Sequence, residues 1–182
     1  MKTFGPGIPE GSGPVGVGID QSYSGFAVAA VNDSGYAVEV YKGKGAGVDR
    51  LIDIQKFLLS RLDGCSEYGI KNIAMEGYAP AAKFGANMSG ELGAAVKLCI
   101  RNAYDIPVDY PLVVAPSTLK KYVTGKGNVQ KQQVMLQTFK KWGVELTDDN
   151  AADAYGLARI AFGFADHKYE QDVIDMVHAE KE

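Results

Sequence analysis

The chain has 182 residues, of which 46% are hydrophobic and 23% charged, as in a single globular domain with a full core. No apolar run reaches the roughly 18 residues of a membrane-spanning helix, and the opening residues MKTFGPGIPEGSGP lack the apolar core of a signal peptide. The two cysteines (Cys65, Cys99) and two histidines (His167, His178) have no metal-ligand spacing, which argues against a zinc site or a histidine-based triad and favours reduced thiols in the cytoplasm.

Taken in chain order, the hydrophobic pattern predicts an α/β fold. Residues 1–14 read as a flexible Gly/Pro arm, and residues 166–182 as a polar tail that is compatible with a helix. Strands are predicted at 15–20, 25–31, 36–42, 72–76 and 112–115. Helices are predicted at 48–62, 89–104, 129–142 and 149–165, with a short one opened by Pro116. The resulting domain, 15–165, is a five-stranded mixed sheet with three antiparallel strands, then parallel ones, and helices on both faces.

Carboxylates stand at the ends of several of these elements. Asp20 ends the first strand and Glu76 the fourth, while Asp149 and Asn150 lie four and three residues before Asp153, a spacing that places each pair on one helical face. Each acid alone has an ordinary explanation as a cap, a turn or a surface charge, and we expect Asp148 to cap the last helix. Together they predict one cluster, whose mutual repulsion a divalent cation such as Mg²⁺ would relieve.

Charge is unevenly distributed, although the net charge is only −3. Between residues 110 and 144 there is no acid. This segment carries six lysines: Lys120, Lys121, Lys126, Lys131, Lys140 and Lys141. A basic surface beside an acidic cluster is typical of a protein that binds a polyanion together with a metal ion. The alternative is an ordinary solvated helix face.

Five motifs, in this order, make the sequence resemble the RuvC family of Holliday-junction resolvases, which belongs to the RNase H-like superfamily. They are GIDQSYSGFAV, IAMEGY, GELGAAVK, APSTLKKYVTGKGNVQKQQV and NAADAYGLA, and the resemblance covers about residues 15–165. It implies a homodimeric, Mg²⁺-dependent endonuclease that binds branched DNA in the cytoplasm and makes paired cuts in two of its strands. The dimer would form through residues 89–104. A phage or otherwise divergent member fits the short chain best.

The resemblance also assigns roles to residues. Asp20, Glu76 and Asp153 would be catalytic metal ligands, with Asp149 or Asn150 as the fourth, because Asn150 stands where the bacterial enzymes have an acid or a histidine. Lys131 would steady the scissile phosphate, and Lys120 and Lys126 would contact the DNA backbone. The aromatic residue that opens the junction would be Tyr78 or Phe84.

Three other interpretations remain open from the sequence. A sugar-kinase-like phosphotransferase would need two duplicated halves, and the stretch VGVGIDQ has Gln21 where a phosphate loop requires its third glycine. A different RNase H-like nuclease, acting on RNA or on other DNA branches, would share the same metal chemistry. A junction-binding protein without catalytic activity is favoured by the uncharged Asn150.

Overall fold

The computed structural model describes residues 7–77, 86–104 and 110–179 and is built on a five-stranded sheet in the order β3-β2-β1-β4-β5. The strands are β1 (Val15–Asp20), β2 (Phe26–Asn32), β3 (Gly35–Tyr41), β4 (Ile70–Glu76) and β5 (Leu112–Val114). β1 pairs antiparallel with β2 and parallel with β4; β2–β3 is antiparallel and β4–β5 parallel. The predicted mixed sheet is confirmed.

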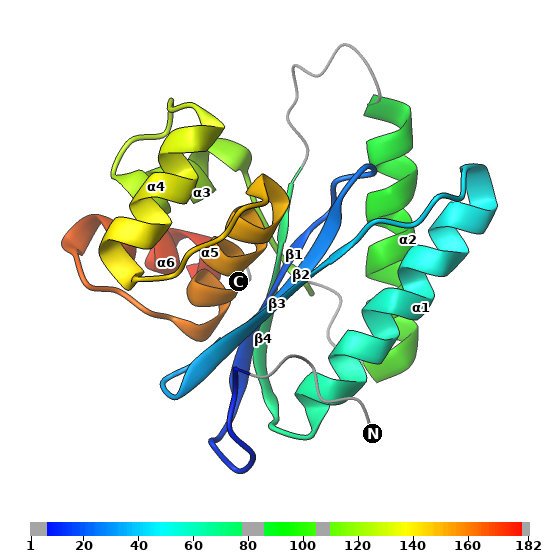
Figure 1. Cartoon of the computed structure of the whole chain (residues 1–182), viewed down its shortest axis with the longest axis horizontal. Coiled ribbons are helices and arrows are strands. Elements are labelled where there is room, and N and C mark those ends of the chain that lie inside the picture. Colours follow the sequence, from blue (N-terminus) through cyan, green and yellow to red (C-terminus); the bar gives the residue numbers. More distant parts are fainter. Residues whose placement is uncertain (1–6, 78–85, 105–109, 180–182) are drawn as a thin grey trace.

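Six helices cover the two faces of this sheet in the described part of the chain. They are α1 (Gly47–Ser66), α2 (Ala86–Tyr104), α3 (Pro116–Thr124), α4 (Lys131–Trp142), α5 (Asp149–Phe162) and α6 (Lys168–Ala179). Figure 1 shows α1 and α2 on one face and α3 to α6 on the other. None of the described helices is long and apolar enough to cross a membrane.

The central strand β1 has two different faces because its side chains alternate. Val15, Val17 and Ile19 are fully buried in the core beneath α1 and α2. The other face carries Gly16 and Gly18, and a Cβ atom at either glycine would come within 2.5 Å of main-chain atoms of α5. Helix α5 therefore lies directly on the backbone of β1, and the same period-2 alternation places Asp20 on the α5 side.

The limits of four helices depart from the sequence prediction. Helix α1 continues to Ser66, four residues beyond its predicted end. Helix α2 begins at Ala86, three residues before its predicted start. Helix α4 begins at Lys131, two residues later than predicted, after an extended Gln130. Helix α5 ends at Phe162 because Gly163 adopts a left-handed conformation (φ 91°) and closes the helix with hydrogen bonds to Arg159 and Ile160. The predicted cap is confirmed, since the Asp148 side chain accepts from the main-chain N–H groups of Asn150 and Ala151.

The described parts of the two predicted terminal segments contact the domain. In the described part of the predicted arm, residues 7–14, Ile8 is 8% exposed and its carbonyl accepts from the Tyr68 hydroxyl at 3.2 Å. In the predicted tail, α6 buries Val173, Ile174 and Val177 in the core formed with α3, α5 and β5. Helix α6 is therefore part of the folded domain, while the described part of the arm is anchored at Ile8 and otherwise largely exposed.

A buried ion pair fastens α6 to α4. Glu170 is 0% exposed; one carboxylate oxygen pairs with Lys141 Nζ, and the other accepts from the main-chain N–H groups of Asp166 and His167 at 2.6 and 2.9 Å. Lys141 also donates to the Tyr169 hydroxyl at 3.0 Å. Lys141 is thus a structural residue, and the prediction that all six lysines form one basic surface is wrong at this position.

We expect Glu170→Gln to lower the free energy of unfolding by about 2–4 kcal/mol, because it leaves the Lys141 charge buried without its counterion. For a chain of this size that corresponds to a melting temperature lower by about 5–12 °C in a thermal melt. Glu91→Gln, an exposed change on α2, is the control and should leave the melting temperature unchanged. Equal melting temperatures for both variants would show that the pair contributes nothing to stability.

Candidate active site

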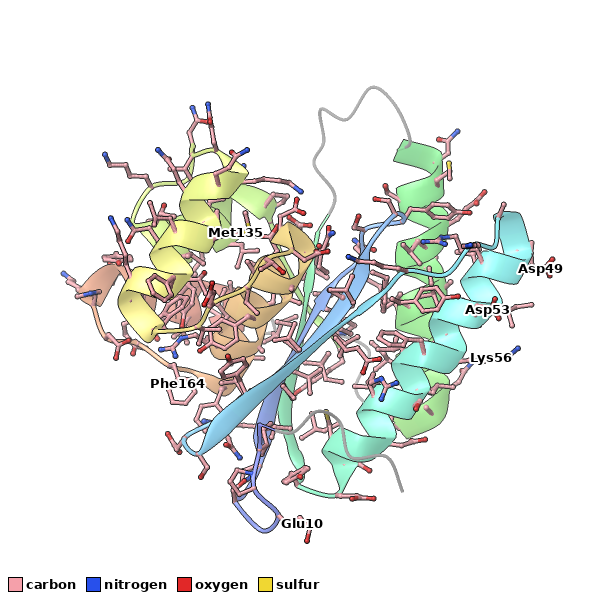
Figure 2. The ribbon with its side chains drawn as sticks, viewed as in Figure 1. Glu10, Asp49, Asp53, Lys56, Met135 and Phe164 are labelled. Atoms are coloured by element: carbon pink, nitrogen blue, oxygen red, sulfur yellow. The ribbon has the colours of Figure 1, made fainter. Side chains whose placement is uncertain are left out.

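Three carboxylates from different elements meet at one edge of the sheet. Asp20 ends β1 and Glu76 ends the neighbouring parallel strand β4, so both stand at the carboxyl ends of their strands. Asp153 comes from the first turns of α5, which lies across β1. Asp49 and Asp53 lie away from this cluster: Figure 2 shows them on the outward side of α1, across the sheet from α5.

The three carboxylates hold their protons more tightly than isolated acids do. Burial, followed by the charges of Glu76 and Asp153, raises the pKa of Asp20 well above its usual value. Burial and then the charge of Glu76 raise the pKa of Asp153 to about 7. Burial also raises the pKa of Glu76, against the effects of a hydrogen bond with Asp20 and of two nearby lysines. Burial therefore opposes the ionisation of all three acids, and the charges of neighbouring carboxylates oppose that of Asp20 and Asp153 as well.

Such a set fits a hard divalent cation by its chemistry. All three groups offer oxygen ligands, and a bound cation would offset the repulsion that raises the pKa values of Asp20 and Asp153. Among the described residues, no three Asp, Glu, His or Cys side chains are already grouped tightly enough to hold one ion. The carboxylates would have to close on the metal as it binds.

The structure separates the two candidates for a fourth ligand. The charge of Asp149 contributes to raising the pKa of Asp153, and its carboxylate pairs with Lys131 Nζ at 2.5 Å. The Asn150 amide instead donates to Asp148 at 3.1 Å, and a Cβ atom on Gly25 would come within 2.4 Å of its nitrogen. Asp149 is therefore electrostatically coupled to the cluster, while Asn150 is held against the loop between β1 and β2.

Two of the predicted DNA-contacting lysines lie near the cluster. Lys131, at the start of α4, and Lys120, on α3, both lower the pKa values of Glu76 and Asp153. Desolvation lowers the pKa of Lys131, but its bond to Asp149 and the charges of Asp149, Asp153 and Asp20 outweigh this and raise it. Lys126 is exposed just beyond α3. Tyr78 and Phe84, the predicted junction-opening residues, lie outside the described residues.

Two residues beside the site were missed by the sequence reasoning. Gln21 donates from Nε2 to the main-chain carbonyl of Glu76 at 2.6 Å. Arg50, only 5% exposed, donates from Nε to the main-chain carbonyl of Tyr23 at 2.8 Å, with its guanidinium 5.0 Å from the centre of the Tyr23 ring. Both hold the loop that follows Asp20. Only Gln21 had a sequence signal, namely a long amide directly after a strand-end acid.

Comparisons with known proteins bear on the fold and the family. No family model matches the chain. A stretch of 48 residues is 50% identical to the crossover junction endodeoxyribonuclease RuvC of Chlamydia muridarum; it covers 24% of this chain and 28% of that protein. Thermus thermophilus RuvC matches with a TM-score of 0.60 and 17% identity over 92% of this chain and 96% of that one. The same protein in complex with a Holliday junction substrate matches with a TM-score of 0.65 and 18% identity over the same shares.

At 17% and 18% identity, the two structural matches show that the fold is shared. The sequence match to the Chlamydia protein covers only 28% of that protein. The chain thus has the RNase H-like fold of RuvC over nearly its whole length, and the local sequence identity, added to that fold, supports its assignment to the RuvC family.

Proposed function

We propose that the protein is a Mg²⁺-dependent, structure-specific endonuclease that cuts four-way DNA junctions in the cytoplasm. The observation that carries the proposal is the cluster of Asp20, Glu76 and Asp153: burial raises the pKa of all three, and neighbouring carboxylates raise those of Asp20 and Asp153 further. Lysines beside this cluster supply the charge that a DNA backbone needs. We propose a four-way junction as the substrate because the Thermus thermophilus RuvC structure with the same fold is a complex with a Holliday junction.

We assign metal binding to the acidic residues of the site and phosphate binding to its lysines. Asp20, Glu76, Asp153 and Asp149 would hold two Mg²⁺ ions, with Asn150 as the alternative fourth ligand. When bound, the metal supplies a water of lowered pKa and stabilises charge on the leaving 3′-oxygen, which gives a 5′-phosphate product.

The lysines would bind the substrate. Lys131 Nζ pairs with Asp149 at 2.5 Å, and it would be free to contact the scissile phosphate if Asp149 served as a metal ligand. Lys120 and Lys126 would hold the flanking DNA backbone. Because these contacts displace counterions, DNA binding through them should weaken as salt is added.

Paired cleavage needs two sites related by a two-fold axis, so we propose a homodimer. Helix α2 supports this assignment because it leaves large apolar side chains in solvent: Leu98 is 58% exposed and Met88 is 44% exposed. The inner face of the same helix, with Leu92, Val96 and Ile100, is fully buried in the core. The outer face is therefore the part of α2 available to a second copy.

A junction-binding protein without cleavage activity is the second candidate. It is favoured by the pairing of Asp149 with Lys131 together with the turn of Asn150 toward Asp148, which leaves three carboxylates free to bind metal.

The test is cleavage of a labelled four-way junction with Mg²⁺, beside a linear duplex and an RNA–DNA hybrid, for the wild type and Asp20→Asn. We expect symmetric paired nicks in the junction alone, lost in the variant. Cleavage of the hybrid, or of every substrate, would support the proposed metal site but show that the proposed substrate is wrong. Junction binding without any cleavage would establish the non-catalytic protein instead.

A further inference from the structure

Gln21 directly follows β1, at the point where the hydrogen-bonded pairing between β1 and β4 ends. The parallel ladder of β1 and β4 ends at the pair Ile19–Met75, and Asp20 pairs only on its other side, with Ala27 of β2. The next main-chain carbonyl of β4 belongs to Glu76, and it accepts from Gln21 Nε2 at 2.6 Å. The side chain of Gln21 therefore adds one hydrogen bond between the ends of β1 and β4, next to Asp20 and Glu76.

The orientation of the Gln21 amide follows from its partner. A main-chain carbonyl can only accept a hydrogen bond, so the atom that faces Glu76 is the nitrogen, and Oε1 faces away. Gln21 is 7% exposed, and its Oε1 is buried with no hydrogen-bond partner among the described residues. A buried oxygen without a donor destabilises the fold by at least as much as one neutral hydrogen bond stabilises it.

The unsatisfied oxygen offsets what the hydrogen bond to Glu76 contributes to stability, so stability alone does not account for a glutamine at this position. We propose that Gln21 is a positioning residue for the metal site. Its amide fixes the main chain of Glu76 relative to Asp20 and so sets how closely the two carboxylates can approach a common ion. Its unpartnered oxygen could accept a hydrogen bond from a water bound to such an ion. This inference rests on the proposed metal-dependent function. It adds a residue that touches neither substrate nor ion directly.

Gln55 offers a matched control elsewhere in the same fold. Its Nε2 also donates to a main-chain carbonyl, that of Ala95, at 3.0 Å, but it connects α1 to α2 in the layer on the other face of the sheet from α5. Gln21→Met and Gln55→Met each remove one amide and one such hydrogen bond while keeping the length of the side chain. Only the first change is at the ends of β1 and β4.

The experiment measures Mn²⁺ binding to the DNA-free protein by electron paramagnetic resonance, beside a thermal melt. We expect Gln21→Met to weaken Mn²⁺ binding by about 10- to 100-fold, as for residues that orient metal ligands, and Gln55→Met to leave it unchanged. The Mn²⁺ concentration for half-maximal junction cleavage should rise in parallel for Gln21→Met. Gln21→Asn keeps an amide that is one methylene too short to reach Glu76, so it should show the same weakening if Gln21→Met does not fold.

The outcomes separate this inference from the proposed function. Wild-type Mn²⁺ affinity in a folded Gln21→Met or Gln21→Asn variant would overturn the positioning role alone. Equal weakening in the Gln21 and Gln55 variants would also overturn it, since the loss would then be a general effect of removing a buried hydrogen bond. Failure of the wild type to bind Mn²⁺ at all would overturn both this inference and the metal-dependent function.

Discussion

Asp153→Asn should lower the rate of junction cleavage by at least about 10³-fold while making the metal-free protein more stable. The two effects have one cause. Asp153 lies where burial and the charge of Glu76 oppose its ionisation, so its pKa is raised to about 7. Asparagine has nearly the same shape but no charge, and it therefore relieves the repulsion and removes a metal ligand in one step.

The gain in stability should depend on pH in a direction that the raised pKa fixes. Between the ordinary value of 3.8 and about 7, folded Asp153 keeps a proton that the unfolded chain has lost. The contribution of this group to stability is therefore complete at low pH, falls as the pH rises through this window, and is constant above it. From about pH 5.5 to about pH 8.5, the advantage of Asp153→Asn over the wild type should grow by about 2 kcal/mol.

Thermal melts at the two pH values, with and without Mg²⁺, check this prediction. Mg²⁺ should raise the melting temperature of the wild type and not that of Asp153→Asn, because only the wild type has the complete ligand set. Asp172→Asn, an exposed change on α6, serves as the control and should behave like the wild type. If Asp153→Asn melted at or below the wild type at the higher pH, Asp153 would not be a strained member of the cluster.

The parts of this site that the sequence could predict are those fixed by local periodicity. The carboxyl ends of neighbouring parallel strands lie side by side, so Asp20 and Glu76 could be paired as soon as both strands were recognised. The i, i+4 spacing likewise placed Asp149 and Asp153 on one side of a helix. What the sequence left open was the choice between Asp149 and Asn150. That choice depends on the rotation of α5 about its axis, which is set by contacts such as that between Asn150 and Gly25.

Contacts between distant segments could not be predicted in this way. Gln21 and Glu76 are 55 positions apart, and Lys141 and Glu170 are 29 apart, with no periodic pattern to connect them. Lys141 reads as one more surface lysine until α6 places Glu170 against it. Charge counted along the sequence therefore overestimated the basic surface, because a lysine is assigned to solvent or to the core by its tertiary contacts.

Gly18→Ala should be strongly destabilising, lowering the free energy of unfolding by about 3 kcal/mol or more. The added Cβ would come within 2.0 Å of the carbonyl oxygen of Ala154 and within 2.3 Å of the nitrogen of Ala158. Both are main-chain atoms in the middle of α5, which no rotamer change can move. The helix would have to shift outward by roughly 1.5 Å to restore normal contact distances.

Asp153 directly precedes Ala154, so this shift would also carry its carboxylate away from Asp20. A displacement of this size can reduce a catalytic rate by about 10²-fold. Gly18→Ala should therefore lose cleavage at temperatures where it is still folded, which cleavage assays well below its melting temperature would detect. Gly90→Ala on α2 is the matched control: its Cβ would meet no atom within 4 Å, and alanine in a helix should stabilise by about 0.5–1 kcal/mol. A Gly18→Ala protein with wild-type stability and cleavage would mean that α5 does not lie on the backbone of β1, and the position of Asp153 in the candidate site would fall with that packing.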